Sequence, residues 1–320
     1  MRWFIGRRDL RNQGILGMNC RNIDFIGRYN PRSLYSLVDD KLKTKRLARR
    51  HEIPVPELCF VVREQYKVRT VERMLHPLDG FAVKPAKGSG GKGILIARER
   101  EGKTFIRSSG ARLAPEDIRR HISNILAGLY SLAGTPDVAI VEKLVQFDER
   151  FTGYSYQGVP DIRIIVFQGY PVMAMLRLAT RESDGKANLH QGAVGVGLDI
   201  GTGRCLHAVQ HSRSLTAHPD TGQVFEHIHL PDWSGILRLA ARCYEMTGLG
   251  YLGTDIVLDR ERGPLLLELN ARPGLAIQLA NGHGLLPRLR HIEKLGGKHA
   301  TVEERVSHAM EVFADPREQA

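Results

Sequence analysis

The stretch that decides the fold reads Gly253-Thr254-Asp255-Ile256-Val257-Leu258, then Asp259-Arg260-Glu261-Arg262-Gly263, then Pro264-Leu265-Leu266-Leu267-Glu268-Leu269-Asn270. Two apolar runs flank a charged turn that ends in glycine, which is typical of a β-hairpin. If Asp259 and Pro264 close the loop, Asp255 lies opposite Glu268, and Asn270 shares a strand face with Glu268. Opposed residues on one face lie within about 5 Å of each other. The hairpin therefore predicts three oxygen ligands at its open end, suited to Mg²⁺ that also carries substrate phosphates.

The alternative interpretation of this hairpin is one surface acid and two polar residues at strand ends. A carboxylate inside the run Leu-Leu-Leu-Glu-Leu is costly to bury without a partner, and this favours the metal site. Asp255, Glu268 and Asn270 are accordingly the predicted metal ligands.

Length and composition indicate a globular enzyme, with two lobes expected. The chain has 320 residues, of which 42% are hydrophobic and 25% charged, so it can bury a large core. No apolar run approaches the roughly 18 residues of a membrane span, and the basic N-terminus has no apolar segment behind it. The cysteines are far apart and are expected to be reduced thiols; they are Cys20, Cys59, Cys205 and Cys243. We therefore expect a cytoplasmic protein without a transmembrane segment.

Positive charge is concentrated near the N-terminus. The net charge is +11, and residues 1–50 hold 13 Lys or Arg against four Asp. Such a segment suits nucleic acid, an anionic membrane surface or an acidic protein tail, but a solvated basic face without a partner is an equal alternative. No aromatic residues are interleaved in a nucleic-acid-binding pattern, so nucleic acid is the least favoured partner.

The hydrophobic pattern predicts an α+β protein with mostly antiparallel strands. Helices are expected at residues 39–50, 71–75 and 234–247, and another opens at Ala114-Pro115-Glu116-Asp117. Its apolar positions run on to Leu129 and Leu132, and Gly134 is expected to end it. Besides the hairpin, strands are expected at residues 59–63, 81–84, 94–97, 138–144, 161–168, 171–179 and 193–198.

A glycine-rich loop separates two of these strands and reads Lys84-Pro85-Ala86-Lys87-Gly88-Ser89-Gly90-Gly91-Lys92-Gly93. Glycines let the backbone approach a polyphosphate, and the lysines offset its charge. The loop formally matches the dinucleotide fingerprint, but a strand follows where a helix should open. The P-loop and protein-kinase patterns also fail. We expect a mobile loop that covers phosphates, the alternative being a plain hairpin tip.

Three further segments bear on binding and catalysis. The backbone of Val141-Glu142-Lys143-Leu144-Val145, at a strand end, can pair with a purine. Arg163 and Arg177 are expected on neighbouring apolar strands, where arginine binds carboxylate or phosphate bidentately. The alternative for each is a salt bridge to Asp161 or Glu182. No nucleophile elbow or Cys–His pair occurs, and the paired histidines lack a third zinc ligand, so covalent catalysis is not expected.

In this order, a lysine before a glycine-rich hairpin, a Glu-Lys-Leu linker and an Asp…Glu-x-Asn hairpin resemble the ATP-grasp superfamily. Two further motifs are similar to its RimK-type α-L-glutamate ligases: Asp161-Ile162-Arg163…Arg177…Asn188-Leu189-His190-Gln191-Gly192, and Glu268-Leu269-Asn270-Ala271-Arg272-Pro273-Gly274. The resemblance covers about residues 39–290. It implies an ATP-grasp fold, in which two α/β lobes with mostly antiparallel sheets clasp ATP.

The resemblance also implies a division of the chain. A basic N-terminal arm would span residues 1–40 and the ATP-grasp domain residues 41–290, followed by a C-terminal tail over residues 291–320. Within that domain, the lid would span about 57–143 and the metal-binding body about 144–290. The family usually carries a complete α/β domain where this chain has about 40 basic residues. A second subunit or a partner protein would then complete the acceptor site, and Arg272, which replaces a small residue, would alter the substrate.

Matched residue by residue, the resemblance implies a nucleotide site and a reaction. ATP and two Mg²⁺ ions are the expected cofactors, with Mn²⁺ as a substitute. Phosphates would be held by Lys41, Lys84, Lys87 and Ser89. Adenine would be framed by Glu142, Lys143 and Leu144, and ribose would contact Glu149. The metal ligands would be Asp255, Glu268 and Asn270, and the acylphosphate or substrate carboxylate would be clamped by Arg163, Arg177 and Asn188.

The implied activity is that of an ADP-forming carboxylate–amine ligase that works through an acylphosphate. It would add L-glutamate, or another amino acid, to an acidic small molecule, peptide or protein tail. Such an enzyme positions groups and stabilises charge without a nucleophile of its own. The alternative is a non-catalytic or partner-dependent ATP-binding regulatory protein.

Overall fold

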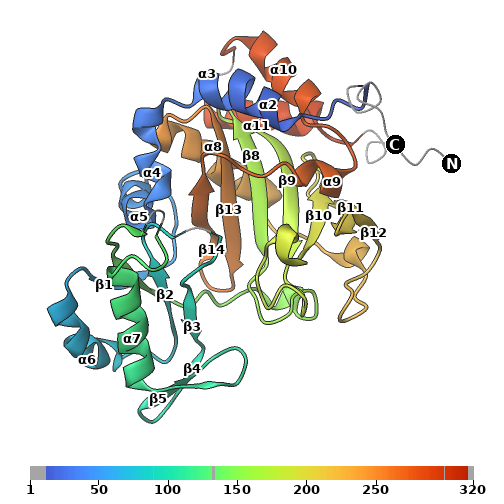
Figure 1. Ribbon diagram of the computed structural model, residues 1–320. Helices are drawn as coiled ribbons and strands as arrows, with labels where there is room; N and C mark the ends of the chain where they lie inside the picture. The colour runs from blue at the N-terminus through green and yellow to red at the C-terminus, as the bar shows by residue number, and fades with distance from the viewer. Residues whose placement is uncertain (1–11, 89, 132–133, 299, 316–320) are drawn as a thin grey trace.

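Two antiparallel sheets, one in each half of the chain, carry the fold (Figure 1). The computed structural model describes residues 12–88, 90–131, 134–298 and 300–315. Every strand pairing within these ranges is antiparallel, which confirms the predicted α+β class. None of the described helices is long and apolar enough to cross a membrane. All four cysteines are free thiols.

The sheets use most of the predicted strands. A four-stranded sheet has the order β1 (Leu58–Val62), β7 (Ala139–Lys143), β2 (Phe81–Pro85) and β3 (Leu95–Ala97). A small sheet in the same half has the order β4 (Glu99–Glu101), β5 (Thr104–Ile106) and β6 (Arg112–Leu113). The seven-stranded sheet has the order β12 (Arg213–Leu215), β11 (Cys205–Gln210), β10 (Val194–Leu198), β9 (Tyr170–Leu178), β8 (Asp161–Phe167), β13 (Tyr251–Asp259) and β14 (Gly263–Asn270).

The helices surround these sheets. The α-helices are α2 (Met18–Cys20), α3 (Gly27–Tyr29), α4 (Ser36–Asp39), α5 (Lys41–Arg50), α6 (Val71–Leu75), α7 (Pro115–Leu126), α8 (Trp233–Thr247), α9 (Ile277–Asn281), α10 (Leu286–Leu295) and α11 (Val302–Val312). The π-helix η1 (Arg21–Ile26) joins α2 to α3. Short 3₁₀ helices are η2 (Arg32–Leu34), η3 (Gln65–Thr70), η5 (Glu149–Phe151), η6 (Leu189–Gln191) and η7 (Phe225–His227).

The predicted helix over residues 39–50 is divided at Asp40. This residue is extended, with φ −118° and ψ 102°, and its carboxylate accepts from the backbone N–H groups of Leu42 and Lys43. Asp40 is therefore the N-cap of α5. The cap fixes the direction of the first helical turn, which carries Lys41.

The predicted helix that opens at Pro115 is shorter than the pattern indicated. It ends at Leu126, and Leu129 is 66% exposed. Gly128 has a φ of +84° and packs against the backbone of Thr135, so a left-handed glycine turns the chain there. The extension to Leu129 was therefore wrong, and Leu132 lies outside the described residues.

The hairpin pairs its acids as predicted, although its closing pair was wrong. Asp259 pairs with Gly263, one residue from the predicted partner Pro264. A β-bulge between Asp255 and Ile256 then shifts the register by one residue. Asp255 consequently lies opposite Glu268 after all, so the bulge compensates for the mistaken closure.

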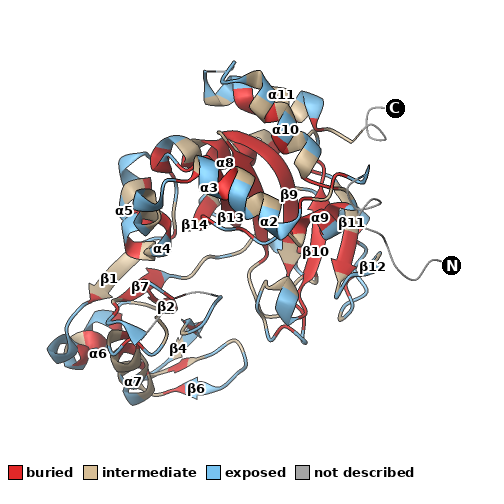
Figure 2. Cartoon of the chain, turned by 45° about the horizontal axis from the view of Figure 1, so that its top comes forward, coloured by how far each residue is buried: buried red, intermediate tan, exposed pale blue. Residues whose placement is uncertain are grey.

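Both ends of the described chain pack on the seven-stranded sheet (Figure 2). The ring of Phe25 lies edge-on to Phe167, with centroids 5.5 Å apart. The Asn30 amide accepts from the Tyr251 N–H at 2.8 Å and donates to the Tyr251 carbonyl at 2.7 Å. At the other end, Phe313 is buried in the same core as α11. The segments predicted as an arm and a tail thus both contribute residues to the core, among them Phe25 and Phe313.

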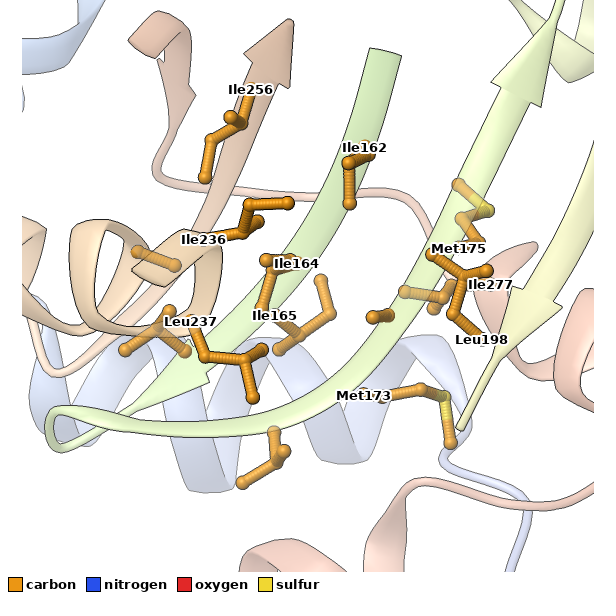
Figure 3. Close-up of a cluster of buried hydrophobic side chains, with 14 of the residues drawn as sticks. Ile162, Ile164, Ile165, Met173, Met175, Leu198, Ile236, Leu237, Ile256 and Ile277 are labelled. Atoms are coloured by element: carbon orange, nitrogen blue, oxygen red, sulfur yellow. The ribbon is translucent and has the colours of Figure 1, made fainter. Parts of the chain in front are cut away.

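Strand alternation separates the core from the site. Ile162 and Ile164 of β8 pack toward Ile236 of α8, whereas Met175 of β9 lies near Ile277 of α9 (Figure 3). Arg163 lies between the two isoleucines in sequence and therefore points to the opposite face. Because α8 covers one face, the charged positions of β8 collect on the other face.

We predict that Gly197→Ala destabilises the protein by about 1–3 kcal/mol, the usual cost of overpacking. A Cβ at this position of β10 would overlap the backbone of Ala280 in α9. Gly17→Ala is the matched control, because nothing lies within 4 Å of the added carbon. Urea denaturation of both variants measures the difference, and equal stabilities would show that α9 is free to move away.

Candidate active site

A cleft between the two large sheets gathers residues from five separate elements, namely α4, α5, β2, β7 and β14. It opens to solvent. Four predicted site residues line it, namely Lys41, Lys84, Glu142 and Glu268. The other lining residues are Val38, Thr44, Lys45, Val55, Ile94, Leu266, Leu267 and Leu269. Charged groups thus meet an apolar wall that comes mainly from β14.

Glu142 is the most enclosed charge of the cleft. Its carboxylate lies 2.7 Å from the Lys84 ammonium and 2.9 Å from the Lys45 ammonium. Burial acts to raise the pKa of Glu142, but the two lysines outweigh it, so the pKa is lower than usual. Burial likewise lowers the pKa of Lys45, although Glu142 opposes the change. The Glu142 side chain, which is predicted to frame adenine, is paired with these two lysines.

Lys45 is the cleft residue that the sequence analysis missed. Its ammonium also donates to the Pro56 carbonyl at 2.5 Å, so it ties α5 to the segment before β1. The sequence could have indicated this residue, because Lys41 and Lys45 are four residues apart and therefore share one face of a helix.

Lys41 connects the glycine-rich loop to the hairpin. Its ammonium donates to the Gly88 carbonyl at 2.6 Å and lies 3.1 Å from the Glu268 carboxylate. The Glu268 side chain is 33% exposed, so it faces the open cleft with a cation beside it. Lys41 and Glu268, predicted to bind phosphate and metal respectively, are therefore neighbours in the cleft.

The other loop residues lie away from this contact. The Lys87 side chain is exposed and donates to the Pro136 carbonyl at 3.2 Å, while its backbone N–H binds the Asp137 carboxylate. Ser89 lies outside the described residues. The Lys143 side chain is 61% exposed and lies 3.7 Å from Glu57, because alternate residues of β7 point to opposite faces.

Asp255 is held by both predicted arginines. Arg163 donates to it through Nε and, at 2.7 Å, through Nη2, and Arg177 Nη2 donates at 2.7 Å. The Asn270 amide lies 3.5 Å from the same carboxylate. Burial acts to raise the pKa of Asp255, but Arg163 and Arg177 overcome it and lower the pKa. Asp255 therefore remains ionised inside the sheet.

Asp161 completes this network. It is paired with Arg177 across β8 and β9, and its carboxylate lies 2.5 Å from Arg177 Nε. Burial, with a smaller contribution from Asp255, raises the pKa of Asp161 to about 6 despite Arg177. The alternative considered for Arg177, a salt bridge to Asp161 or Glu182, is thus present with Asp161. Glu182 instead contacts His211 at 2.7 Å.

The donor set fits Mg²⁺ only as a partner of phosphate. Within the described ranges, no group of three His, Cys, Asp or Glu side chains is placed to hold a metal ion. Asp255, Glu268 and the Asn270 amide offer hard oxygen ligands and leave coordination positions open. A closed protein cage is therefore excluded by the described side chains, whereas a site completed by a ligand's oxygens fits them.

Three further predicted residues, Asn188, Glu149 and Leu144, are also not among the residues that line the cleft. Asn188 caps η6, where its side-chain oxygen accepts from the His190 N–H at 3.0 Å. Glu149 is exposed and lies 2.9 Å from Arg260 in the hairpin turn. Leu144 is half-buried beside Gly80.

We predict that Glu142→Gln lowers the free energy of unfolding at pH 7 by about 3–5 kcal/mol, because two buried ammonium groups lose their counter-charge. Since the folded pKa of Glu142 is lowered, its ionised form stabilises the fold above the ordinary value of about 4.3. That stabilisation disappears as the pH falls through the folded pKa. The difference between wild type and variant should therefore shrink at pH 3–4.

Urea denaturation across pH 3–7 measures this difference. The matched control is Glu99→Gln, a change at an exposed residue of β4. A wild-type–variant difference that is constant across this range would contradict the role given to the ionised carboxylate.

Known proteins share this arrangement of segments. A family profile described as sugar-transfer associated ATP-grasp matches residues 20–294. A probable α-L-glutamate ligase of Maridesulfovibrio salexigens is 25% identical over 238 residues, covering 74% of this chain and 56% of its own. Another from Syntrophotalea carbinolica is 23% identical over 259 residues, covering 80% and 63%. The chain thus spans less than two thirds of the length of either relative.

Among solved structures, D-alanyl-alanine synthetase A from Vibrio cholerae superposes with a TM-score of 0.48 and 13% identity, covering 87% of this chain and 66% of its own. The profile match extends over most of the chain and includes α5 and both large sheets, with the hairpin of β13 and β14. The resemblance inferred from the motifs is thereby confirmed, and the chain belongs to the ATP-grasp superfamily, in the family of sugar-transfer associated ATP-grasp proteins.

Proposed function

We propose that this protein is an ATP-dependent, ADP-forming carboxylate–amine ligase. The contact that supports this most directly is Lys41, which touches both the glycine-rich loop and Glu268 of the hairpin. Phosphate-binding and metal-binding groups therefore face one cleft. The relatives named probable α-L-glutamate ligases support the same reaction class.

In the proposed reaction, a substrate carboxylate oxygen attacks the γ-phosphorus of ATP. The bond from that phosphorus to the bridging oxygen breaks, and ADP leaves with the electron pair. An amine then attacks the acyl carbon of the acylphosphate, the acyl C–O bond breaks, phosphate leaves and the nitrogen loses a proton. No protein nucleophile is needed, so the protein's task is to orient the reactants and stabilise charge.

Each side chain of the cleft has a proposed part in that task. Lys41 and Lys84 bind the ATP phosphates, and Glu142 keeps Lys84 directed into the cleft. Arg163 and Arg177 bind the negative charge that develops on the acyl oxygen, since a guanidinium can donate two parallel hydrogen bonds to an anion. Asp255, Glu268 and Asn270 would hold Mg²⁺, which would offset the negative charge of the phosphates.

The remaining proposed assignments concern Ser89 and described residues that do not line the cleft. Adenine would contact the backbone of Lys143 and the side chain of Leu144. Glu149 would bind ribose, and Asn188 would assist the arginines. Lys87 and Ser89 would cover the phosphates when the loop bends toward the cleft. The number of metal ions, and Mn²⁺ as a substitute, belong to the same proposal.

The proposed substrates are an amino acid such as L-glutamate and an acidic acceptor. The two arginines suit a carboxylate at the reacting centre, and the names of the relatives suggest glutamate. The family description, sugar-transfer associated, makes sugar-bearing carboxylates an acceptor class to include beside peptides and protein tails. A second subunit or partner protein remains the proposed source of additional acceptor contacts.

We predict that Glu268→Ala reduces Mg²⁺-dependent ADP release by at least about 100-fold, the scale of losing one group that stabilises the transition state. The partly exposed ion pair with Lys41 contributes little to folding, so stability should change by no more than about 1 kcal/mol. Glu261→Ala, an exposed acid in the turn of the same hairpin, is the matched control.

The assay combines L-glutamate with acidic peptides, sugar acids and small carboxylates, and mass spectrometry weighs the products. Acceptor-dependent ADP release with a gain of one amino-acid residue would support the ligase. ATP binding without ADP release above the Glu268→Ala level across the panel would overturn it in favour of an ATP-binding regulatory protein.

A further inference from the structure

Each of the four carboxylates around the cleft is already paired with a cation of the same chain. Asp255 is bound by Arg163 and Arg177, and Glu268 lies beside Lys41. Glu142 is held by Lys84 and Lys45, and Asp161 by Arg177. Four negative groups thus meet five positive ones, and the side chains of Asp255 and Asp161 are only 4% and 6% exposed.

This pairing of charges determines which ions can bind at the site. A divalent cation alone would have to approach Asp255 beside two guanidinium groups, which repel it and already occupy the carboxylate oxygens. A polyphosphate changes the situation, because its oxygens are strong partners for arginine and lysine. When phosphate and cation enter together, each broken ion pair is replaced by another, and no buried charge is left unpaired.

We propose that Arg163 and Arg177 lock Asp255 in the nucleotide-free protein, so that a divalent cation binds Asp255 only together with nucleotide phosphate. This inference rests on the proposed function and concerns the order of binding at the same site. Arg177 is the releasable partner. It extends from β9, two strands away from β13, whereas Arg163 pairs directly with Asp255 across β8 and β13.

Asp161 is the positioning residue of this lock. Arg177 binds Asp161 through Nε and Asp255 through Nη2. Because the two contacts use different nitrogens, Nη2 can leave Asp255 while Nε stays on Asp161. The guanidinium then remains at the site and is ready to bind the incoming anion.

The test uses Mn²⁺ as a paramagnetic probe and measures bound ion by electron paramagnetic resonance, without turnover. Wild-type protein should bind Mn²⁺ at least tenfold more tightly with a non-hydrolysable ATP analogue than without it. Arg177→Met should bind Mn²⁺ at least tenfold more tightly than wild type when nucleotide is absent. Arg213→Met, at an exposed residue of edge strand β12, should match wild type.

Two further variants test whether the protein folds without Arg177 and where the gained Mn²⁺ site lies. Asp161→Asn with Arg177→Met removes a charge of each sign and keeps the local balance, so it provides a folded protein if Arg177→Met alone unfolds. Asp255→Asn added to either variant should abolish the gained Mn²⁺ site, which places that site at the hairpin. Circular dichroism and thermal melting verify folding before each titration.

The lock is overturned if nucleotide-free wild type binds Mn²⁺ as tightly as the nucleotide complex does. It is equally overturned if the folded variants that lack Arg177 gain no Mn²⁺ affinity. These outcomes are separate from the fate of the ligase proposal. A protein that binds Mn²⁺ only with nucleotide and yet releases no ADP would retain the lock and lose the ligase.

Discussion

The ion pair between Arg163 and Asp255 joins β8 to β13, the strand beside edge strand β14 of the seven-stranded sheet, and the other charged groups of the site contact it or lie near it. Both residues sit on strands that are buried along their length, where a single charge could not be accommodated. Pairing them across β8 and β13 lets these two buried strands carry charge without leaving either charge unpaired. Arg177 and Asp161 extend the same solution to the next strand.

Much of the fold follows from local patterns in the sequence. The hairpin, the antiparallel strands and α8 were predicted because their apolar periods are long and uninterrupted. The pairing of Asp255 with Glu268 was also predicted, but through a wrong closing pair that the bulge corrected. A bulge depends on cross-strand packing, so the sequence of residues 264–268 alone does not predict it.

The site was harder to predict than the fold. Motif matching identified Lys41, Lys84 and Glu268, which meet at the cleft. It did not reveal that Asp255 would be shared by two arginines, since a chain of ion pairs across three strands depends on register rather than on sequence spacing. Lys45 was missed although its helical spacing from Lys41 was visible. The length of α7 was overestimated because apolar periodicity continues past the glycine that turns the chain.

The two hydrogen bonds between the Asn30 side chain and the Tyr251 backbone show that the N-terminal segment belongs to the same folding unit as β13. One side chain pairs with both backbone polar groups of a buried residue at the start of β13, and Phe25 and Tyr29 contact Phe167 beside it. Residues 16–30 are therefore structural members of the half that holds the seven-stranded sheet. A fragment that begins at Lys41 would uncover aromatic surface and leave the backbone of Tyr251 without the Asn30 side chain, so it should aggregate.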